Sequence, residues 1–266
     1  MILSLGITPK RYAQFGSSND ADAQAFITAA GITDATQQSA VNQLVLDLKS
    51  ANIWTKMKAI YPILGGSASS HAVNLKTPGT FNLTFTTGWT HSSNGMIGNG
   101  TSSYANTALN PLTQLTLNNT HLSFYSRTAT ASSTWQDIGN TNPPAQFAIT
   151  AGYSNVAYSD SYNYNTGRIT QANTDAKGFY IQSRTTNAIH KLFKNGTQFG
   201  TTNTGASGTF VNNNIYIGAV NQTSSAPYNT ARQYAFSSIG DGLSDAEVTS
   251  LNTAVSTFQT TLGRNV

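Results

Sequence analysis

Short runs with strand character recur along the chain from residue 59 onward, and Gly, Asn, Ser and Pro separate them rather than long helices. The clearest run alternates Phe81, Leu83 and Phe85 with polar residues, which predicts a strand with three large side chains on one buried face. Similar runs span 122–125, 147–150, 179–182, 191–194 and 215–217. Closely spaced strands of this kind form antiparallel sheets, so the pattern predicts a mainly β protein with an antiparallel sandwich over residues 59–266.

Two helices are predicted ahead of the strands. Asp20 is placed to cap the first, and Gly31 is suited to end it in the left-handed conformation. The second begins after Thr33 or Asp34 and carries an apolar stripe with helical spacing, formed by Val41, Leu44, Val45 and Leu48. This stripe must be covered, either by the chain's own sheet, which is the preferred alternative, or by another subunit in an attachment or oligomer contact.

The first 19 residues show no helical period and are predicted to form an extended arm ordered by contact with a neighbouring molecule. Ile2, Leu3 and Leu5 are its candidate apolar contacts for attachment or oligomerisation. We therefore divide the chain into an N-terminal arm and helical attachment segment, residues 1–58, and a sandwich with a C-terminal helix, residues 59–266.

The C-terminal region returns to helical periodicity. Ser244 and Glu247 have the spacing of a capping box, in which each side chain satisfies a backbone N–H of the first turn. Beyond them an apolar stripe recurs in steps of three and four residues, formed by Val248, Leu251, Val255, Phe258 and Leu262. The stripe fits a helix lying across the sandwich, which we prefer, or a short coiled-coil seam.

Charge is scarce. Charged residues make up 9% of the chain, against roughly 25% of an average soluble protein. The net charge of +4 reflects few acids more than many bases, so we expect no nucleic-acid partner. The absence of cysteine excludes disulfides and thiolate metal sites. No run approaches the roughly 18 consecutive apolar residues of a membrane span, so we expect no membrane insertion.

Four segments in order carry a resemblance to a known fold family. They are GNGTSSYANT (98–107), LFKNGTQFG (192–200), NIYIGAVN (214–221) and AFSSIGDGLSDAEVTSLN (235–252). Their order is similar to that of concanavalin A-like lectin/glucanase sandwiches, particularly the laminin-G-like type. In the second segment, Asn195 and Gly196 tolerate the positive φ angles of a two-residue hairpin turn. The resemblance implies a jelly-roll sandwich. Relatives that bind metal use acidic loop residues, and the middle of this chain has no acidic cluster to match them.

A second resemblance spans nearly the whole chain. The helical stretch from Asp20 to Gly66, the segment GWTHSSNG and the ending SDAEVTSLNTAVSTFQTTLGR resemble virion structural proteins of tailed bacteriophages, including crAss-like phages. This resemblance implies a particle component that carries a lectin-like sandwich on an attachment module. It leaves open whether that component belongs to the head or the tail.

Few residues are suited to catalysis or metal binding. Glycosidases of this architecture need two carboxylates across the scissile bond, whereas Asp137, Asp160 and Asp175 of the strand region have no acidic neighbour in sequence. The single glutamate, Glu247, already serves a helix cap. The histidines lack the spacing of a ligand set and are predicted to have separate structural or surface roles. They are His71, His91, His121 and His190. We therefore predict a protein that is not an enzyme, with no catalytic residue, metal or cofactor.

One stretch has the composition of a recognition surface. In YSNVAYSDSYNYN, tyrosines alternate with Ser and Asn, as in the binding loops of antibodies, and aromatic rings also stack on the apolar faces of sugars. The candidate glycan contacts are Tyr153, Tyr158, Tyr162 and Tyr164, with Trp89 as a weaker one. The structural alternative is a polar hairpin with cross-strand tyrosine pairs, and a tryptophan in a sandwich is usually part of the core.

Two functional hypotheses follow. The first is a non-enzymatic phage structural protein, made in the host cytoplasm and placed on the outer surface of the virion as a fibre or decoration component. It would contact other virion proteins and form a homo-oligomer, with a trimer as one arrangement. The second is a carbohydrate-binding adhesin that recognises host surface glycans through the tyrosine-rich stretch.

Overall fold

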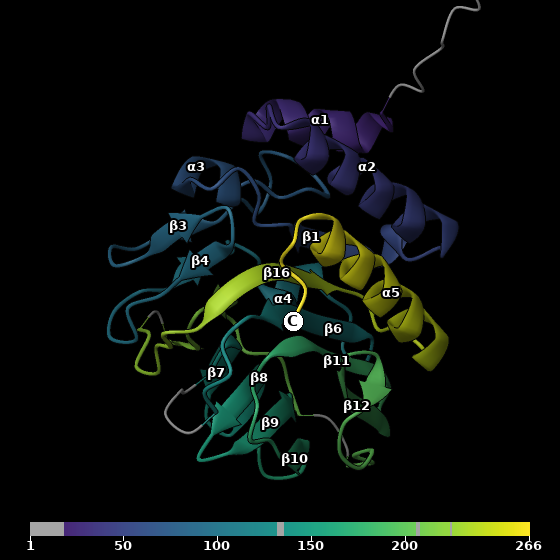
Figure 1. The fold of residues 1–266 in the computed structure, drawn as a ribbon. Coiled ribbons are helices and arrows are strands. Elements are labelled where there is room, and N and C mark those ends of the chain that lie inside the picture. Colours follow the sequence, from purple (N-terminus) through teal and green to yellow (C-terminus); the bar gives the residue numbers. More distant parts are fainter. Residues whose placement is uncertain (1–18, 132–135, 206–207, 224) are drawn as a thin grey trace, which may run out of the picture.

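The computed structural model describes residues 19–131, 136–205, 208–223 and 225–266. The predicted arm contacts Ile2, Leu3 and Leu5 lie outside these residues. Within them the molecule has three layers, which are a group of helices and two β-sheets that we call sheet A and sheet B (Figure 1).

Sheet A is the middle layer. Its strand order is β13 (Thr197–Gln198), β12 (Ile189–Lys194), β11 (Gly178–Thr186), β6 (Thr120–Ser126), β16 (Gln233–Gly240), β4 (Gly95–Ile97) and β3 (Thr90–Ser92). Strand β1 (Met57–Tyr61) also pairs with β16. All of these pairings are antiparallel.

Sheet B is the outer β layer. Its order is β10 (Arg168–Ala172), β9 (Val156–Ser161), β8 (Ala145–Tyr153), β7 (Ile138–Asn142), β14 (Tyr216–Ile217), β5 (Ala105–Asn106) and β2 (Thr84–Phe85). Strand β15 (Asn221–Gln222) adds a short parallel pairing to β7. The predicted mainly β antiparallel sandwich is therefore confirmed.

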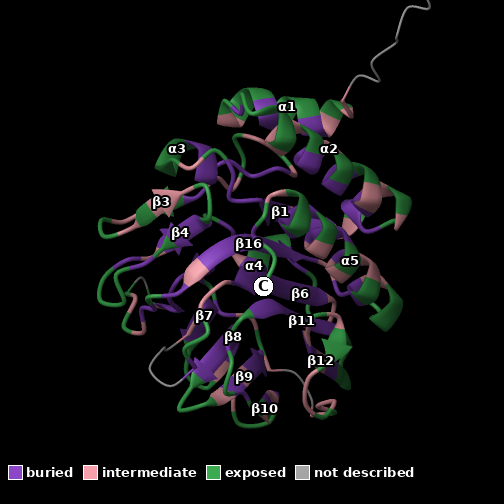
Figure 2. Cartoon of the chain, viewed as in Figure 1, coloured by how far each residue is buried: buried purple, intermediate pink, exposed green. Residues whose placement is uncertain are grey.

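Two hydrophobic cores hold the layers together. One lies between the sheets, where alternate residues such as Leu122, Phe147 and Ile217 are fully buried. The other lies between sheet A and the helices, where Tyr125 and Phe236 from the sheet meet helical side chains. Sheet A is thus covered on both faces, and its central strands β6 and β16 are buried along most of their length (Figure 2).

The helices begin and end where local chemistry predicts. Asp20 caps α1 (Ala21–Ala30), and Gly31 ends it with φ of 63°. Asp34, rather than Thr33, caps α2 (Ala35–Ser50). The capping box of Ser244 and Glu247 opens α5 (Asp245–Thr261). Shorter turns are a 3₁₀ helix at Trp54–Lys56, α3 (Ala68–His71) and α4 (Pro111–Gln114). No described helix is long and apolar enough to cross a lipid bilayer.

Both apolar helix stripes are used inside the chain. The stripe of α5 packs on sheet A, which confirms the preferred placement across the sandwich. Val41, Leu44, Val45 and Leu48 of α2 are at most 1% exposed in the same core. Their assignment as attachment or oligomer contacts is therefore wrong, because they already cover the chain's own hydrophobic surface. Residues 19–58 share this core with the sandwich, so the described helices pack against sheet A as part of the same folded body.

The strand predictions hold in most places. Asn195 and Gly196 take φ angles of 52° and 77° in the turn between β12 and β13, as the hairpin requires. The run at 81–85 departs from the prediction. Only Thr84–Phe85 forms a strand, Leu83 alone is buried, and Phe81 has a φ of 54° that breaks the extended backbone.

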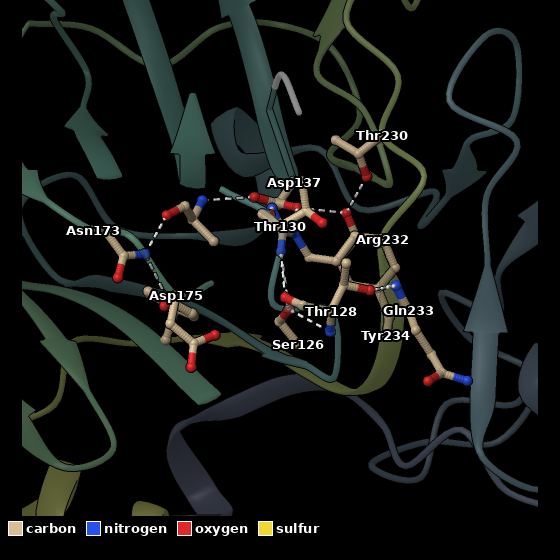
Figure 3. Close-up of polar contacts among 12 residues, drawn as sticks. Ser126, Thr128, Thr130, Asp137, Asn173, Asp175, Thr230, Arg232, Gln233 and Tyr234 are labelled. Carbon is tan, nitrogen blue, oxygen red and sulfur yellow. Dashed lines mark hydrogen bonds and ion pairs between the residues drawn. The ribbon is translucent and has the colours of Figure 1, made fainter. Parts of the chain in front are cut away.

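A buried ion pair joins the two sheets (Figure 3). Asp137, next to β7 of sheet B, and Arg232, next to β16 of sheet A, are both fully buried. Oδ1 of Asp137 accepts hydrogen bonds from Nε of Arg232 at 2.6 Å and from the Tyr234 hydroxyl at 2.7 Å. Oδ2 accepts one from the backbone N–H of Ala151 at 2.6 Å. Buried charges with this many partners specify one arrangement of the two strands.

The first prediction is that Arg232→Met lowers the free energy of unfolding by about 3–5 kcal/mol, because it leaves the Asp137 carboxylate buried without its counter-charge. Lys191→Met is the control. It breaks the exposed pair with Asp245 and is expected to cost at most about 1 kcal/mol. Urea unfolding followed by fluorescence measures both, and equal losses would contradict the role assigned to the buried pair.

Three histidines are buried and neutral. Burial lowers the pKa of His71 to about 3, of His121 to about 4 and of His190 to about 3, from an ordinary value of 6.5. His121 lies between the backbone carbonyl of Asp241 and the Ser238 hydroxyl. In the unfolded chain these rings take up protons near pH 6.5, whereas in the folded chain they do not until the pH is much lower.

The second prediction is a loss of stability in acid. Between pH 6.5 and about 4 the unfolded state binds more protons, so each buried histidine lowers the free energy of unfolding by about 1.4 kcal/mol per pH unit. Stability measured by urea unfolding should be greatest above pH 6.5 and fall across this window. Replacing His190 by Gln removes one titrating ring, so the free energy of unfolding should fall less steeply with pH, by up to about 1.4 kcal/mol per pH unit. An unchanged slope would contradict the lowered pKa of His190.

Candidate functional site

A pocket of about 370 Å³ opens on the outer face of sheet B, over β7 to β10. Phe147, Ile149 and Ala157 point into the core between the sheets, whereas Thr150 and Tyr158 alternate with them and line the pocket. The lining residues are Gln136, Thr141, Pro143, Gln146, Thr150, Tyr153, Tyr158, Asp160, Tyr164, Arg168, Gln222 and Tyr228.

Strand register brings the central residues together. Thr141 lies opposite Gln146 in the β7–β8 pair, Thr150 opposite Tyr158 in β8–β9, and Asp160 opposite Arg168 in β9–β10. Directly opposed residues on one face of an antiparallel pair are close enough for their side chains to interact. The site is therefore a direct product of three consecutive hairpin registers.

Four polar side chains form a connected network on the pocket floor. The Asp160 carboxylate accepts hydrogen bonds from Nε of Arg168 at 2.7 Å, from Nη2 of Arg168 at 3.0 Å and from Nε2 of Gln146 at 2.6 Å. The Thr141 hydroxyl donates to Oε1 of Gln146 at 3.1 Å. Asp160 is 1% exposed, whereas the Arg168 side chain is 34% exposed. The floor thus buries a carboxylate and presents a guanidinium to the opening.

Aromatic rings surround this guanidinium. Its Cζ atom lies 5.0 Å from the ring centroid of Tyr158 and 5.5 Å from that of Tyr164, within the range of cation–π attraction. Tyr153, at the end of β8, and Tyr228, in the segment before β16, add two further rings to the lining. The pocket therefore combines flat apolar surfaces with planar hydrogen-bonding groups.

The electrostatics of Asp160 follow from its burial. Loss of hydration raises the pKa of the Asp160 carboxyl above its ordinary value, and the hydrogen bonds from Arg168 and Gln146 oppose that shift by stabilising the charged form. Asp160 and Arg168 are the acidic and basic side chains of the lining. Their charges compensate each other.

Three of the predicted glycan contacts meet in this pocket, namely Tyr153, Tyr158 and Tyr164. Tyr162 does not, so its assignment as a contact is wrong. It is 1% exposed, stacks on Phe147 in the core between the sheets, and hydrogen-bonds through its hydroxyl to Thr120. Burial raises the pKa of the Tyr162 hydroxyl. A backbone φ of 70° after the end of β9 turns this ring inward, so strand alternation does not apply to it.

Trp89 also lies outside the pocket, so it is not a contact of this site. It packs on the core between the sheets, with its ring 5.8 Å from Phe85 and 6.3 Å from Tyr234. A Cβ on Gly218 would overlap the Trp89 ring, which shows how closely the ring is covered. Trp89 therefore packs against the core, as expected for a tryptophan in a sandwich.

Sequence patterns missed several lining residues. One signal could have found Asp160 and Arg168. In a β9–β10 hairpin with the observed register, these two opposite charges lie directly across from each other. Gln146 carries no comparable signal. Tyr228 comes from a distant segment with no regular secondary structure, so no local pattern points to it.

The pocket lining is poor in acids, and the described residues form no metal-ligating cluster. Asp160 is the one carboxylate among the lining residues, and no group of three or more His, Asp or Glu side chains within the described ranges could hold a metal ion. The Nε2 atoms of His190 and His121 lie 3.0 Å from the hydroxyls of Ser159 and Ser238, but all four residues are buried in the sandwich. His71 and His91 meet through their Nδ1 atoms at 2.9 Å, contrary to the expected separate roles.

Sequence comparisons give no relatives. No protein-family model matches the chain, and a search of curated proteins found no match.

Solved structures share the fold. Trypanosoma rangeli sialidase in complex with sialic acid has a TM-score of 0.53 and 11% identity, covering 79% of this chain and 38% of that one. The binding domain of botulinum neurotoxin DC in complex with rat synaptotagmin II has a TM-score of 0.52 and 12% identity, covering 76% and 52%. The botulinum neurotoxin serotype D binding domain has a TM-score of 0.50 and 12% identity, covering 76% of this chain and 52% of that one.

These likenesses show that the chain has a jelly-roll sandwich fold, as the segment order implied. At such low identity they establish the fold alone. The chain spans about half the length of the toxin binding domains and about two fifths of the sialidase. The function must therefore be argued from the pocket.

The third prediction separates the core tyrosine from the pocket tyrosines. Tyr162→Ala should lower the free energy of unfolding by about 3–5 kcal/mol, because it empties a buried site between the sheets. Tyr164→Ala, at a half-exposed ring, should cost about 1 kcal/mol or less. Thermal and urea unfolding of the two variants measures the difference, and equal stability would contradict the inward placement of Tyr162.

Proposed function

We propose that this protein is a non-enzymatic carbohydrate-binding module that holds a small sugar unit in the tyrosine-lined pocket of sheet B. The observation that carries the proposal is the combination of aromatic rings with a planar amide, a carboxylate and a guanidinium in one pocket. A sugar ring has an apolar C–H surface on its faces and hydroxyls around its edge. Aromatic rings match the first, and planar polar side chains match the second.

The size of the pocket supports a small ligand. Its volume of about 370 Å³ lies at the lower end of the range of roughly 300–1,000 Å³ for small-molecule sites. This suits one or two sugar units rather than a long chain. Tyr153 on the rim is 38% exposed, so the opening presents an aromatic surface to an incoming ligand.

Binding without hydrolysis accords with the single carboxylate of the lining. Most glycosidases use two carboxyl groups, about 5–10 Å apart, as acid and as nucleophile or base. In the pocket the Asp160 carboxylate already accepts hydrogen bonds from Arg168 and Gln146. We therefore assign it a positioning role toward Arg168 and no chemical step.

The virion role stays a prediction that rests on the sequence resemblance. A surface component of a phage particle can contain a glycan-binding module. In that case the virion hypothesis and the adhesin hypothesis describe the same protein. Attachment or oligomerisation would then depend on surfaces other than the buried stripe of α2. The mass of the chain in solution, with and without residues 1–18, tests whether the predicted arm contributes.

The fourth prediction tests the glycan site. A panel of mono- and disaccharides on a glycan array, followed by calorimetry, should identify a bound sugar. Tyr158→Ala and Tyr164→Ala should each weaken its binding about tenfold or more, equivalent to about 1.4 kcal/mol of lost stacking and positioning of Arg168.

Tyr104→Ala is the matched control, since Tyr104 is a partly exposed ring that stacks on Tyr216 and lies outside the pocket lining. Its affinity should equal that of the wild type. Sugar binding that is unchanged in Tyr158→Ala, or a wild-type chain that binds no sugar of the panel, would refute the proposal.

A further inference from the structure

We infer that the pocket selects uncharged sugars and discriminates against sugars that carry a carboxylate. This inference rests on the proposed glycan-binding function and names its ligand class. It follows from how Asp160 and Arg168 are held, and from the hydrogen-bonding atoms that remain available around them.

The positive charge of the pocket is already compensated. Arg168 faces the Asp160 carboxylate across the β9–β10 register and donates to both of its oxygens, from Nε at 2.7 Å and from Nη2 at 3.0 Å. This two-point contact is the geometry in which a guanidinium binds a carboxylate best. The side edge of the guanidinium, formed by Nε and Nη2, is therefore occupied by a residue of the protein, and a ligand is left with the end that carries Nη1.

The compensating carboxylate cannot move aside. Asp160 is 1% exposed, and Gln146 anchors its Oδ2 atom at 2.6 Å. Gln146 is in turn held by the Thr141 hydroxyl. A ligand carboxylate near the guanidinium would lie beside this fixed negative charge, and like charges at short range in a partly desolvated pocket repel each other.

The remaining hydrogen-bonding atoms suit hydroxyl groups. Oε1 of Gln136 is buried and has no hydrogen-bond partner among the described residues, so it needs a donor. Nη1 of Arg168, by contrast, is a donor that needs an acceptor, and no bond from it to a described residue occurs. A sugar hydroxyl both donates and accepts, whereas a carboxylate only accepts. A C6 hydroxyl placed against the Gln136 oxygen can therefore donate to it, whereas a carboxylate in the same place cannot and leaves that buried oxygen unpaired.

The overall charge of the chain works in the other direction. A net charge of +4 attracts anions at long range. Selection of neutral sugars would thus be a local property of the pocket. Variants of pocket residues should change it, whereas a variant outside the pocket should not.

The test compares sugars that differ only at C6. Methyl glycosides of galactose and galacturonic acid, and of glucose and glucuronic acid, are titrated against the full chain at pH 7 and fixed salt. The wild type should bind the neutral member of a pair at least about tenfold more tightly than the acidic member.

Two variants should shift this ratio in opposite directions. Asp160→Asn keeps the shape but removes the compensating charge, so the preference for the neutral sugar should shrink about tenfold or reverse. Arg168→Gln removes the cation of the pocket lining, the group that attracts a carboxylate, so the acidic sugar should be rejected more strongly. Tyr104→Ala serves again as the control and should leave the ratio unchanged.

The possible failures are distinguishable. If no sugar of either kind binds, the proposed function itself fails. If the wild type binds the acidic member as well as or better than the neutral one, and Tyr158→Ala abolishes that binding, the pocket is a glycan site but the inferred selectivity is wrong. If Asp160→Asn does not fold, the wild-type ratio and the Arg168→Gln ratio still decide the question.

Discussion

The buried pair of Asp137 and Arg232 fixes how the two sheets face each other, and the pocket depends on it. Asp137 directly follows Gln136, a lining residue, and its carboxylate holds the backbone of Ala151, which follows the lining residue Thr150. Its backbone carbonyl also accepts the N–H of Gly218 on the neighbouring part of sheet B. Since a buried charge tolerates few alternative partners, this one contact specifies the relative position of the segments that bound the pocket.

The location of the pocket follows from which sheet faces are covered. Sheet A has a hydrophobic core on each side, with helices on one and sheet B on the other. Its central strands β6 and β16 are therefore covered on both faces. Sheet B uses one face for the core and carries its polar and aromatic residues on the other. Because side chains alternate along a strand, β8 contributes to both the core and the pocket. Phe147 and Ile149 point into the core, and Gln146 and Thr150 line the pocket.

Charged residues are scarce in the chain as a whole, and they are scarce in the pocket lining too. Its two charged side chains neutralise each other, and amides, hydroxyls and phenol rings make up most of the rest of the lining. The sandwiches of the neurotoxin binding domains and the sialidase share its fold, yet their identity to this chain is about one residue in nine. A shared fold at that distance does not transfer a site, so the proposal here depends on the chemistry of the residues in the pocket.

Sequence alone determined the features that depend on near neighbours in the chain. The caps at Asp20 and Ser244, the turn at Asn195 and Gly196, and the apolar stripe of α5 each involve residues within a few positions of one another, and all occur as predicted. The low charge and the cluster of tyrosines were equally visible without coordinates.

Tertiary structure decided what depends on register and on distant segments. It buried the α2 stripe in the chain's own core and turned Tyr162 inward through one residue of positive φ. It also brought Arg168 against Asp160 and added Tyr228 from a segment about sixty residues further along the chain. The physical reason is that a side chain's neighbours across a sheet are set by strand pairing and loop path. Local patterns in the sequence encode the conformation of each element and leave that pairing to the packing of the whole chain.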